Sequence, residues 1–225
     1  SLIEFEAERR FDDLTVHGSF EAEGGVTALF GASGAGKTTL VHQLVEQDKN
    51  LCVSISHTTR PARPGEENGV NYHFIEKPEF MSRLSNGEFL ESAEVYDYHY
   101  GTSQHWVTEQ LNNGIDVILE IDWQGAQQIR NLYPETCSIF ILPPSLKALT
   151  ERLTDRAQDD SETIESRMLQ ARGVMEHVAE ADFVVVNDEF ETALREIRAI
   201  ILSQRLTVTA QQRILGNLLS SLTRD

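Results

Sequence analysis

Eight consecutive residues near the start of the chain have the spacing of a phosphate-binding loop. The segment GASGAGKT, residues 31–38, fits the pattern G-x-x-x-x-G-K-[ST]. In this pattern the glycines let backbone N–H groups turn toward phosphate oxygens, the lysine carries a positive charge to the β and γ phosphates, and the last hydroxyl is a ligand for Mg²⁺. Lys37 and Thr38 hold these last two positions. The segment therefore predicts a site for a nucleoside triphosphate with Mg²⁺.

A second candidate anion site lies in the segment SHTTRPARPGEENGVNYHF, residues 56–74. It places Arg60 and Arg63 close to Tyr72 in a chain that carries only 19 Lys and Arg against 36 Asp and Glu. Guanidinium groups give bidentate hydrogen bonds that match the oxygens of phosphate. Taken alone, the segment leaves two interpretations open: a second phosphate site, or surface arginines paired with Glu66 and Glu67.

The overall charge excludes several classes of partner. The formal net charge is −17 and the pI is about 4.8, which argues against nonspecific binding to nucleic acid or to anionic membranes. No signal-peptide pattern opens the sequence, and no apolar run approaches the roughly 18 residues of a membrane span. We expect a cytoplasmic protein that acts on small molecules, with no nucleic-acid partner and no membrane partner.

Short apolar runs alternate with helical patterns through most of the chain. The apolar runs are 26–30, 115–121, 138–142 and 183–187. The helical patterns that follow them begin near Lys37 and then span about 124–132, 146–156 and 190–204. Because parallel strands need crossover connections and are buried on both faces, this alternation predicts an α/β fold with a parallel sheet.

Four stretches depart from this alternation and define the expected domain organisation. Residues 1–24 alternate between apolar and polar side chains and predict a hairpin. Residues 56–105 read as a lobe inserted into a core formed by 25–55 and 106–207, and residues 152–167 read as an exposed segment that joins two helices. The last stretch, 208–225, predicts a helix whose apolar stripe packs on the core or on a second subunit of a homo-oligomer.

Several segments in order resemble the guanylate kinase family. They are SHTTRPARPGE (56–66), GEFLESAEV (87–95), YHYGTS (98–103), ILEIDWQGAQQIR (118–130), IFILPPS (139–145) and FVVVNDEF (183–190). The resemblance covers roughly residues 25–207. It implies a P-loop NTPase three-layer fold with a parallel core sheet, an inserted mixed α+β lobe that binds GMP at 56–105, and a helical lid at 152–167. It also implies an enzyme that transfers the γ-phosphoryl group of ATP to GMP, giving ADP and GDP, with Mg²⁺ as cofactor.

The resemblance assigns roles to individual residues of this chain. The implied catalytic set is Lys37, Arg60, Arg152, Arg156 and Arg167, and the implied metal ligand is Thr38. The implied ATP-binding set is Gly31, Ala32, Ser33, Gly34, Ala35, Gly36, Lys37, Thr38, Thr39 and Asn187, the last beside the adenine. The implied GMP-binding set is Ser56, Arg60, Arg63, Tyr72, Glu91, Tyr100, Thr102, Glu120 and Asp122. Physical chemistry agrees for Glu91, because one carboxylate accepts both donors that guanine presents at N1 and its exocyclic amine.

The chain departs from the family pattern at a few positions. Ala32 stands where a proline is usual and Glu120 where an aspartate is usual. The opening residues, about 1–45, resemble a molybdate-type ABC transporter ATPase, which suggests a hybrid or engineered chain. No LSGGQ-like signature follows, so we expect this second resemblance to stop near residue 45.

Two other functions compete with phosphoryl transfer to GMP. One is a guanylate-kinase-like binding module that holds its ligand with little or no turnover, but such a module would have lost the loop lysine or the arginines, and this chain keeps Lys37, Arg60 and Arg63. The other is the ATPase subunit of a transporter, which would need the missing signature motif.

Overall fold

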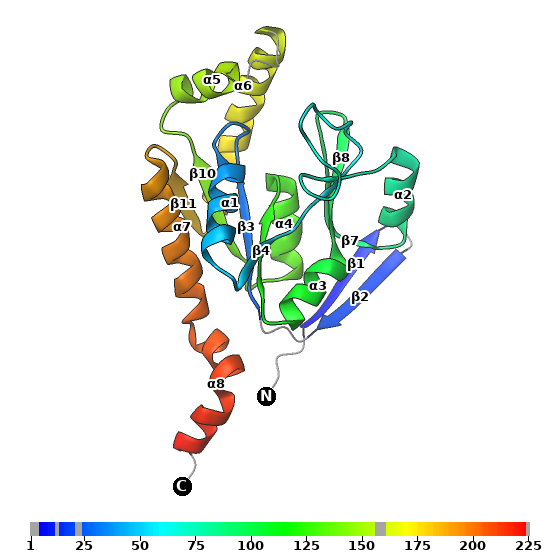
Figure 1. Ribbon diagram of the computed structural model, residues 1–225. Coiled ribbons are helices and arrows are strands. Elements are labelled where there is room, and N and C mark those ends of the chain that lie inside the picture. Colours follow the sequence, from blue (N-terminus) through cyan, green and yellow to red (C-terminus); the bar gives the residue numbers. More distant parts are fainter. Residues whose placement is uncertain (1–4, 12–13, 21–23, 156–160, 224–225) are drawn as a thin grey trace.

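The parts of the chain form three separate sheets with helices around them (Figure 1). A computed structural model describes residues 5–11, 14–20, 24–155 and 161–223. The sheets are a two-stranded hairpin, a five-stranded sheet and a four-stranded sheet.

The five-stranded sheet is the core of the molecule, and all its neighbouring strands are parallel. Its order is β11 (Phe183–Val186), β10 (Cys137–Leu142), β3 (Val26–Gly31), β9 (Asp116–Glu120) and β4 (Leu51–Val53). This confirms the predicted α/β fold with a parallel sheet. The strands β3, β9 and β10 are almost entirely buried, as apolar runs covered on both faces should be.

Helices cover both faces of this sheet and complete three layers. On one face lie α1 (Lys37–Gln47) and α7 (Phe190–Arg205), which pack on alternate strand residues such as Leu29 and Ile141. On the other lie α3 (Gln104–Asn112) and α4 (Trp123–Leu132), which pack on the intervening residues such as Phe30 and Phe140. The alternation of side chains along each strand therefore divides the core into two apolar layers.

The four-stranded sheet belongs to the inserted lobe and mixes parallel with antiparallel pairs. Its order is β6 (His73–Phe74), β5 (His57–Thr58), β8 (Tyr98–Ser103) and β7 (Phe89–Val95), and α2 (Lys77–Ser85) joins β6 to β7. A two-residue turn at Tyr96 and Asp97, with φ of 52° and 65°, connects β7 to β8. Positive φ at both positions matches the twist of an antiparallel hairpin.

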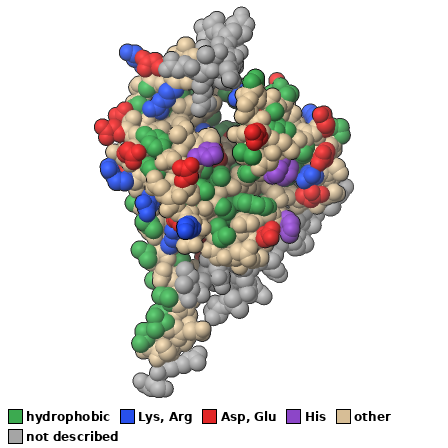
Figure 2. Space-filling view, in the orientation of Figure 1, with side chains coloured by type: hydrophobic (Ala, Val, Ile, Leu, Met, Phe, Trp, Pro, Cys, Tyr) green, Lys and Arg blue, Asp and Glu red, His purple; other side chains and the backbone are tan. Residues whose placement is uncertain are grey.

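Two helices rise beside this lobe and form an arm. They are α5 (Leu146–Asp155) and α6 (Ser161–Met175), and a 3-10 helix, η1 (Glu176–Glu180), continues directly from α6. The expected segment at 152–167 is thus helical at both ends, and its centre, residues 156–160, lies outside the described residues. In Figure 1 the arm and the lobe stand on either side of the carboxyl ends of the core strands, and in Figure 2 the surface is hollowed between them.

The two ends of the chain form the elements that the sequence predicts. Strands β1 (Phe5–Phe11) and β2 (Leu14–Phe20) pair in antiparallel fashion, and α8 (Val208–Thr223) follows α7. In the described part of the chain, none of the helices is both long and apolar enough to cross a membrane.

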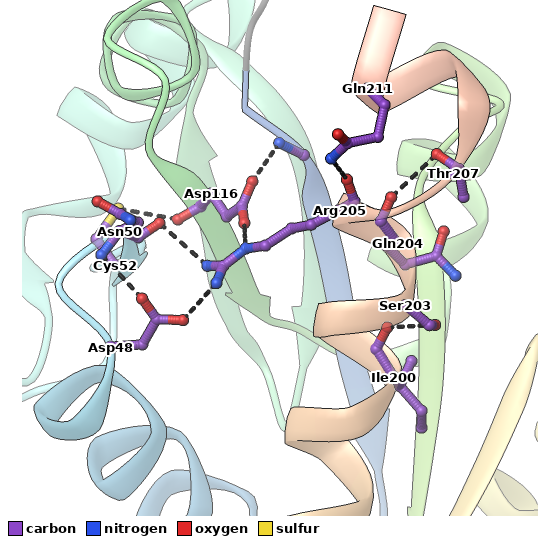
Figure 3. A network of polar contacts seen from close by, with 11 residues as sticks. Asp48, Asn50, Cys52, Asp116, Ile200, Ser203, Gln204, Arg205, Thr207 and Gln211 are labelled. Atoms are coloured by element: carbon purple, nitrogen blue, oxygen red, sulfur yellow. Dashed lines mark hydrogen bonds and ion pairs between the residues drawn. The ribbon is translucent and has the colours of Figure 1, made fainter. Parts of the chain in front are cut away.

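One partly buried charge network holds the amino-terminal ends of the core strands together (Figure 3). Arg205, the last residue of α7, donates from Nε to Asp116 at 2.5 Å and from Nη1 to Asp48 at 2.6 Å. The second carboxylate oxygen of Asp116 accepts from Gly25 N at 2.7 Å. This network joins α7, β9 and the start of β3 at the amino-terminal ends of the core strands, opposite the phosphate loop.

Candidate active site

The phosphate loop follows β3 and ends in the first turn of α1. Its glycines have backbone conformations that side chains rarely adopt, with φ of 139° at Gly31, 86° at Gly34 and 90° at Gly36. A Cβ at Gly31 would collide with the carbonyl of Ile141, and one at Gly36 would collide with the amide of Asn187. Both positions therefore require glycine for shape as well as for backbone freedom.

The lysine and the threonine of the motif both form hydrogen bonds near the loop. Lys37 Nζ donates to the carbonyls of Gly31 at 2.8 Å and Ala32 at 3.1 Å, so its charge lies over the loop. Thr38 is exposed, and its hydroxyl donates to Glu120 Oε1 at 2.5 Å. A hydroxyl and a carboxylate thus meet at the start of the helix.

Asn187 and Arg152 hold the other side of the loop. Asn187 follows β11, is buried, and donates from Nδ2 to Ala35 O at 2.7 Å. Arg152 of α5 donates from Nη2 to the carbonyl of Asn187 at 2.8 Å, while its Nη1 is buried with no hydrogen-bond partner among the described residues. The side chain predicted to lie beside adenine is therefore engaged by the loop, and Arg152 keeps donor capacity for an anion.

The loop rests on the arm through Ala32. This residue is fully buried in an apolar cluster with Leu149 and Leu153 of α5 and Ala171 of α6. A Cβ at Gly34 would lie 3.0 Å from Leu149 Cδ1 and 3.1 Å from Leu153 Cδ2. The helices that follow β10 are thus in direct contact with the phosphate loop.

The second anion site is built around Arg60, at the end of β5. Arg60 is 9% exposed, binds Glu66 through Nη2 at 2.8 Å and 2.9 Å, and donates from Nη1 to Pro61 O at 2.8 Å. Burial lowers the pKa of Arg60, but the hydrogen bonds to Glu66 outweigh it and leave this pKa raised. Arg60 is thus paired with Glu66 inside the lobe and not at its surface, and Arg63 is the exposed arginine.

Two tyrosines lie close to Arg60. The rings of Tyr72 and Tyr100 lie 5.9 Å apart, and Arg60 lies 5.4 Å from the centre of the Tyr72 ring. Burial raises the pKa of Tyr72 to about 12, and the negative charge of Glu120 adds to the increase. Because Glu120 also accepts from Thr38, one carboxylate acts on both the lobe and the phosphate loop.

The guanine-binding residues implied by the resemblance lie deeper between the lobe and α4. Glu91 on β7 and Thr102 on β8 are both buried, and the Thr102 hydroxyl donates to Glu91 Oε1 at 2.6 Å. Asp122 caps α4 by accepting from Gly125 N at 2.8 Å, and burial raises its pKa. Gly125 has no room for a Cβ, because that atom would collide with Glu91 Oε2.

The structure assembles most, but not all, of the predicted set. Ser56 lies just before β5, half-buried, and its carbonyl accepts from His73 N at 2.9 Å. Ser33 and Thr39 are exposed at the rim of the loop, and Ala35 is buried inside it. Arg156 lies outside the described residues, and of Arg167 only the backbone in α6 is described. The close approach of Gly125 to Glu91 was missed, and a glycine inside a helical pattern was the only signal for it.

Comparison with known proteins gives one consistent result. The family model described as guanylate kinase matches residues 25–204. The guanylate kinase of Saccharophagus degradans is 53% identical over 190 residues, which cover 84% of this chain and 93% of that protein. The guanylate kinase of Pseudoalteromonas translucida is 48% identical over 204 residues, which cover 91% of this chain and 99% of that protein.

A solved structure gives the same result for the fold. The crystal structure of guanylate kinase from Anaplasma phagocytophilum matches with a TM-score of 0.69 and 32% identity over 82% of this chain and 88% of that one. The family match includes the strand, loop and helix of residues 25–45 together with residues 46–204. The comparisons lend no support to the expected transporter-like opening or to a hybrid origin.

Proposed function

The chain belongs to the guanylate kinase family, and we propose from this premise how its residues transfer the γ-phosphoryl group of ATP to GMP, giving ADP and GDP. It is an enzyme of the nucleoside monophosphate kinase class, an ATP:GMP phosphotransferase. The phosphate loop is the donor site, and the lobe of residues 56–105 is the acceptor site.

The observation that carries this assignment is the shared position of Glu120. Its carboxylate accepts a hydrogen bond from Thr38 of the donor loop, and its negative charge adds to the larger effect of burial in raising the pKa of Tyr72 in the acceptor lobe. Phosphoryl transfer needs donor and acceptor phosphates in line, and such positioning supplies a large part of the rate enhancement. A residue such as Glu120, which acts on both sites, helps to keep them aligned.

The transfer step needs charge neutralisation more than covalent help. Lys37 lies over the donor loop, and Arg152 has a buried Nη1 beside Asn187 that finds no hydrogen-bond partner in the described part of the chain. These cations stabilise negative charge as it spreads over the transferring group. On the acceptor side, Arg60, Arg63, Tyr72 and Tyr100 bind the GMP phosphate and orient its attacking oxygen. Arg156 and Arg167 join the donor-side cations in this proposal.

The donor loop also has the oxygen ligands that suit Mg²⁺. The Thr38 hydroxyl and the Glu120 carboxylate lie 2.5 Å apart at the exposed start of α1. Among the described residues no cluster of three His, Cys, Asp or Glu side chains forms a metal site, which fits a cation held mainly by phosphates and water. Thr38 would bind the ion and Glu120 its water ligands, and the ion would neutralise phosphate charge.

Guanine selection depends on the buried pair of Glu91 and Thr102. A carboxylate held in this way accepts from N1–H and from the exocyclic amine of guanine, whereas adenine offers an acceptor at N1. The wrong base would place the lone pair of its N1 against the buried Glu91 carboxylate in place of a donor, which disfavours its binding strongly. Asp122 lies next to Glu91 through Gly125 and contributes a further acceptor.

An acceptor panel tests the proposal. ADP formation from MgATP is measured with GMP, AMP, UMP or no acceptor. We expect GMP to be preferred by at least about a hundredfold over AMP. Equal ADP release with and without acceptor would reduce the protein to an ATPase, and GMP binding without ADP formation would favour the binding module.

Three sequence predictions stay proposals beside this one. They are the division into core, GMP-binding lobe and lid, the assembly into homo-oligomers, and the transporter-like resemblance of the opening residues. The transfer of phosphate described above uses the first of them, because the lobe is the acceptor site, and needs neither of the other two.

A further inference from the structure

The arm that contacts the phosphate loop also contacts α4, the helix that packs on β7. In α6, Ala171 packs with Ala32 of the loop, and Met168 Sδ accepts a hydrogen bond from the Thr150 hydroxyl of α5 at 3.5 Å. After Met175, η1 continues from α6 without a break. The position of η1 is therefore coupled to the position of α6, the helix that contacts the donor loop.

The lower end of the arm is joined to α4 by an aromatic stack. The rings of Trp123 and His177 lie 3.8 Å apart at an angle of 8°. His177 Nδ1 and Glu180 Oε1 share a hydrogen bond of 2.6 Å, and Gln127 Nε2 donates to Glu180 Oε2 at 2.9 Å. Trp123 and Gln127 are four residues apart, so a single face of α4 carries the contact.

The neighbouring face of α4 contacts β7, the strand that carries Glu91. Gln128 accepts from the backbone N–H of Ser92 at 3.2 Å and donates to its carbonyl at 2.7 Å. Gly125 lies against Glu91, and Gln124 donates to the carbonyl of Glu94 at 3.4 Å. One short helix thus contacts the arm on one side and the acceptor strand on the other.

We infer that Trp123 and His177 are positioning residues for phosphoryl transfer, because their stack fixes the arm beneath the donor loop relative to the guanine site. The inference rests on the proposed function and extends it to two side chains that contact neither phosphate. The stack is a preformed flat contact between α4 and η1, and it aligns the two sites when both are filled.

Arg130 lies near the same contact. Its charge helps to lower the pKa of Glu180, after the larger effects of the hydrogen bonds with His177 and Gln127. Its Nε and Nη2 are buried with no hydrogen-bond partner among the described residues, which costs free energy.

Steady-state kinetics of two variants test the role of the stack. His177→Ala removes the stacked ring and the hydrogen bond to Glu180, and we expect kcat to fall about tenfold to a hundredfold while KM for GMP changes less than about twofold. His177→Phe keeps a stacked ring and should recover most of kcat. The matched control is Val178→Ala, which removes apolar packing from the same turn of η1 and leaves the stack intact.

The fluorescence of Trp123 gives a readout that simple destabilisation would not change. The chain has two tryptophans, so Trp106→Phe leaves Trp123 as the sole reporter. In this background we expect His177→Ala to raise the emission, because the stacked imidazole quenches it. Addition of GMP with a nonhydrolysable ATP analogue should change the emission when His177 is present, and Val178→Ala should keep that response.

The outcomes separate this inference from the function on which it rests. Absence of GMP-dependent ADP formation in the unmodified protein would overturn both. An active protein in which His177→Ala has the kcat and the thermal stability of Val178→Ala would overturn the inference alone. The same holds if His177→Phe is as slow as His177→Ala, or if ligands leave the Trp123 emission unchanged.

Discussion

The two anion sites of this protein are constructed from different materials. The donor site is eight consecutive residues whose backbone, bent at three glycines, forms the shape that binds phosphate. The proposed acceptor site is formed by side chains from the segment between β5 and β6, from β7 and β8, and from the start of α4, and the buried side chains of Arg60 and Glu91 are held by Glu66 and Thr102. The donor site therefore depends on local conformation, and the acceptor site depends on how distant segments pack.

This contrast predicts that loss of the loop lysine affects chemistry and leaves the acceptor lobe intact. Lys37→Ala should lower kcat on the order of a thousandfold, because a charge directed at the transferring phosphate is removed. Titration calorimetry should show GMP affinity within about twofold of the unmodified protein. Lys49→Ala, an exposed lysine after α1, is the control. Equal loss of GMP binding in Lys37→Ala would show that the sites are not separate.

Lowering the pH should destabilise the acceptor lobe, because this lobe contains a buried histidine. His57 is buried, and burial, followed by the charges of His73 and Arg83, lowers its pKa from 6.5 to about 4. Arg83 Nη1 lies 3.3 Å from His57 Nε2, so Nε2 must accept and the proton lies on Nδ1.

The sign of the effect follows from proton binding. Between pH 6.5 and 4 the unfolded chain takes up a proton that folded His57 does not, so stability is full above pH 6.5 and falls as the pH is lowered toward 4. At about 1.4 kcal/mol for each tenfold change in proton affinity, the loss approaches about 3 kcal/mol. Urea unfolding at pH 7 and pH 4.5 measures it. His57→Gln should remove much of this pH dependence, and exposed His42→Gln should not. An equal loss of unfolding free energy between pH 7 and pH 4.5 in both variants would contradict the assignment to His57.

A smaller effect is expected for the guanine contact. Glu91→Gln keeps an oxygen for Thr102 but turns an amide N–H₂ toward the donors of guanine, so kcat/KM for GMP should fall about a hundredfold while that for AMP changes little. The acceptor panel measures the ratio directly. Glu94→Gln, on the same strand but exposed, is the matched control. An unchanged ratio would remove Glu91 from base selection.

The smallest effect should come from the network at the far edge of the core sheet. Arg205→Gln leaves Asp48 and Asp116 without their cation, and stability should fall by about 2 kcal/mol, less than for a fully buried pair because these side chains are partly exposed. Thermal unfolding measures the change, and exposed Arg195→Gln on the same helix is the control. kcat should stay within about twofold, and a large loss of activity would contradict the separation of this edge from the site.

Much of the core was predictable because its signals are local. The apolar runs at 26–30 and 138–142 and the helical patterns after them lie within one or two residues of β3, β10, α1 and α5. The short strands β5 and β6, with two residues each, gave no such signal, because they exist only through pairing with β8 and with each other. The same reason explains why the pairing of Trp123 with His177 had no counterpart in the sequence pattern.

The amino-acid sequence by itself determined the parallel sheet, the phosphate loop and the chemical types available for binding two phosphates, since periodicity and glycine placement act over a few residues. Only the tertiary structure decided that Glu120 lies between Thr38 and Tyr72, that Asn187 holds the loop, and that Gly125 abuts Glu91. These contacts join residues far apart in the chain. Their geometry is set by how helices pack on a shared sheet, which no short segment of sequence encodes.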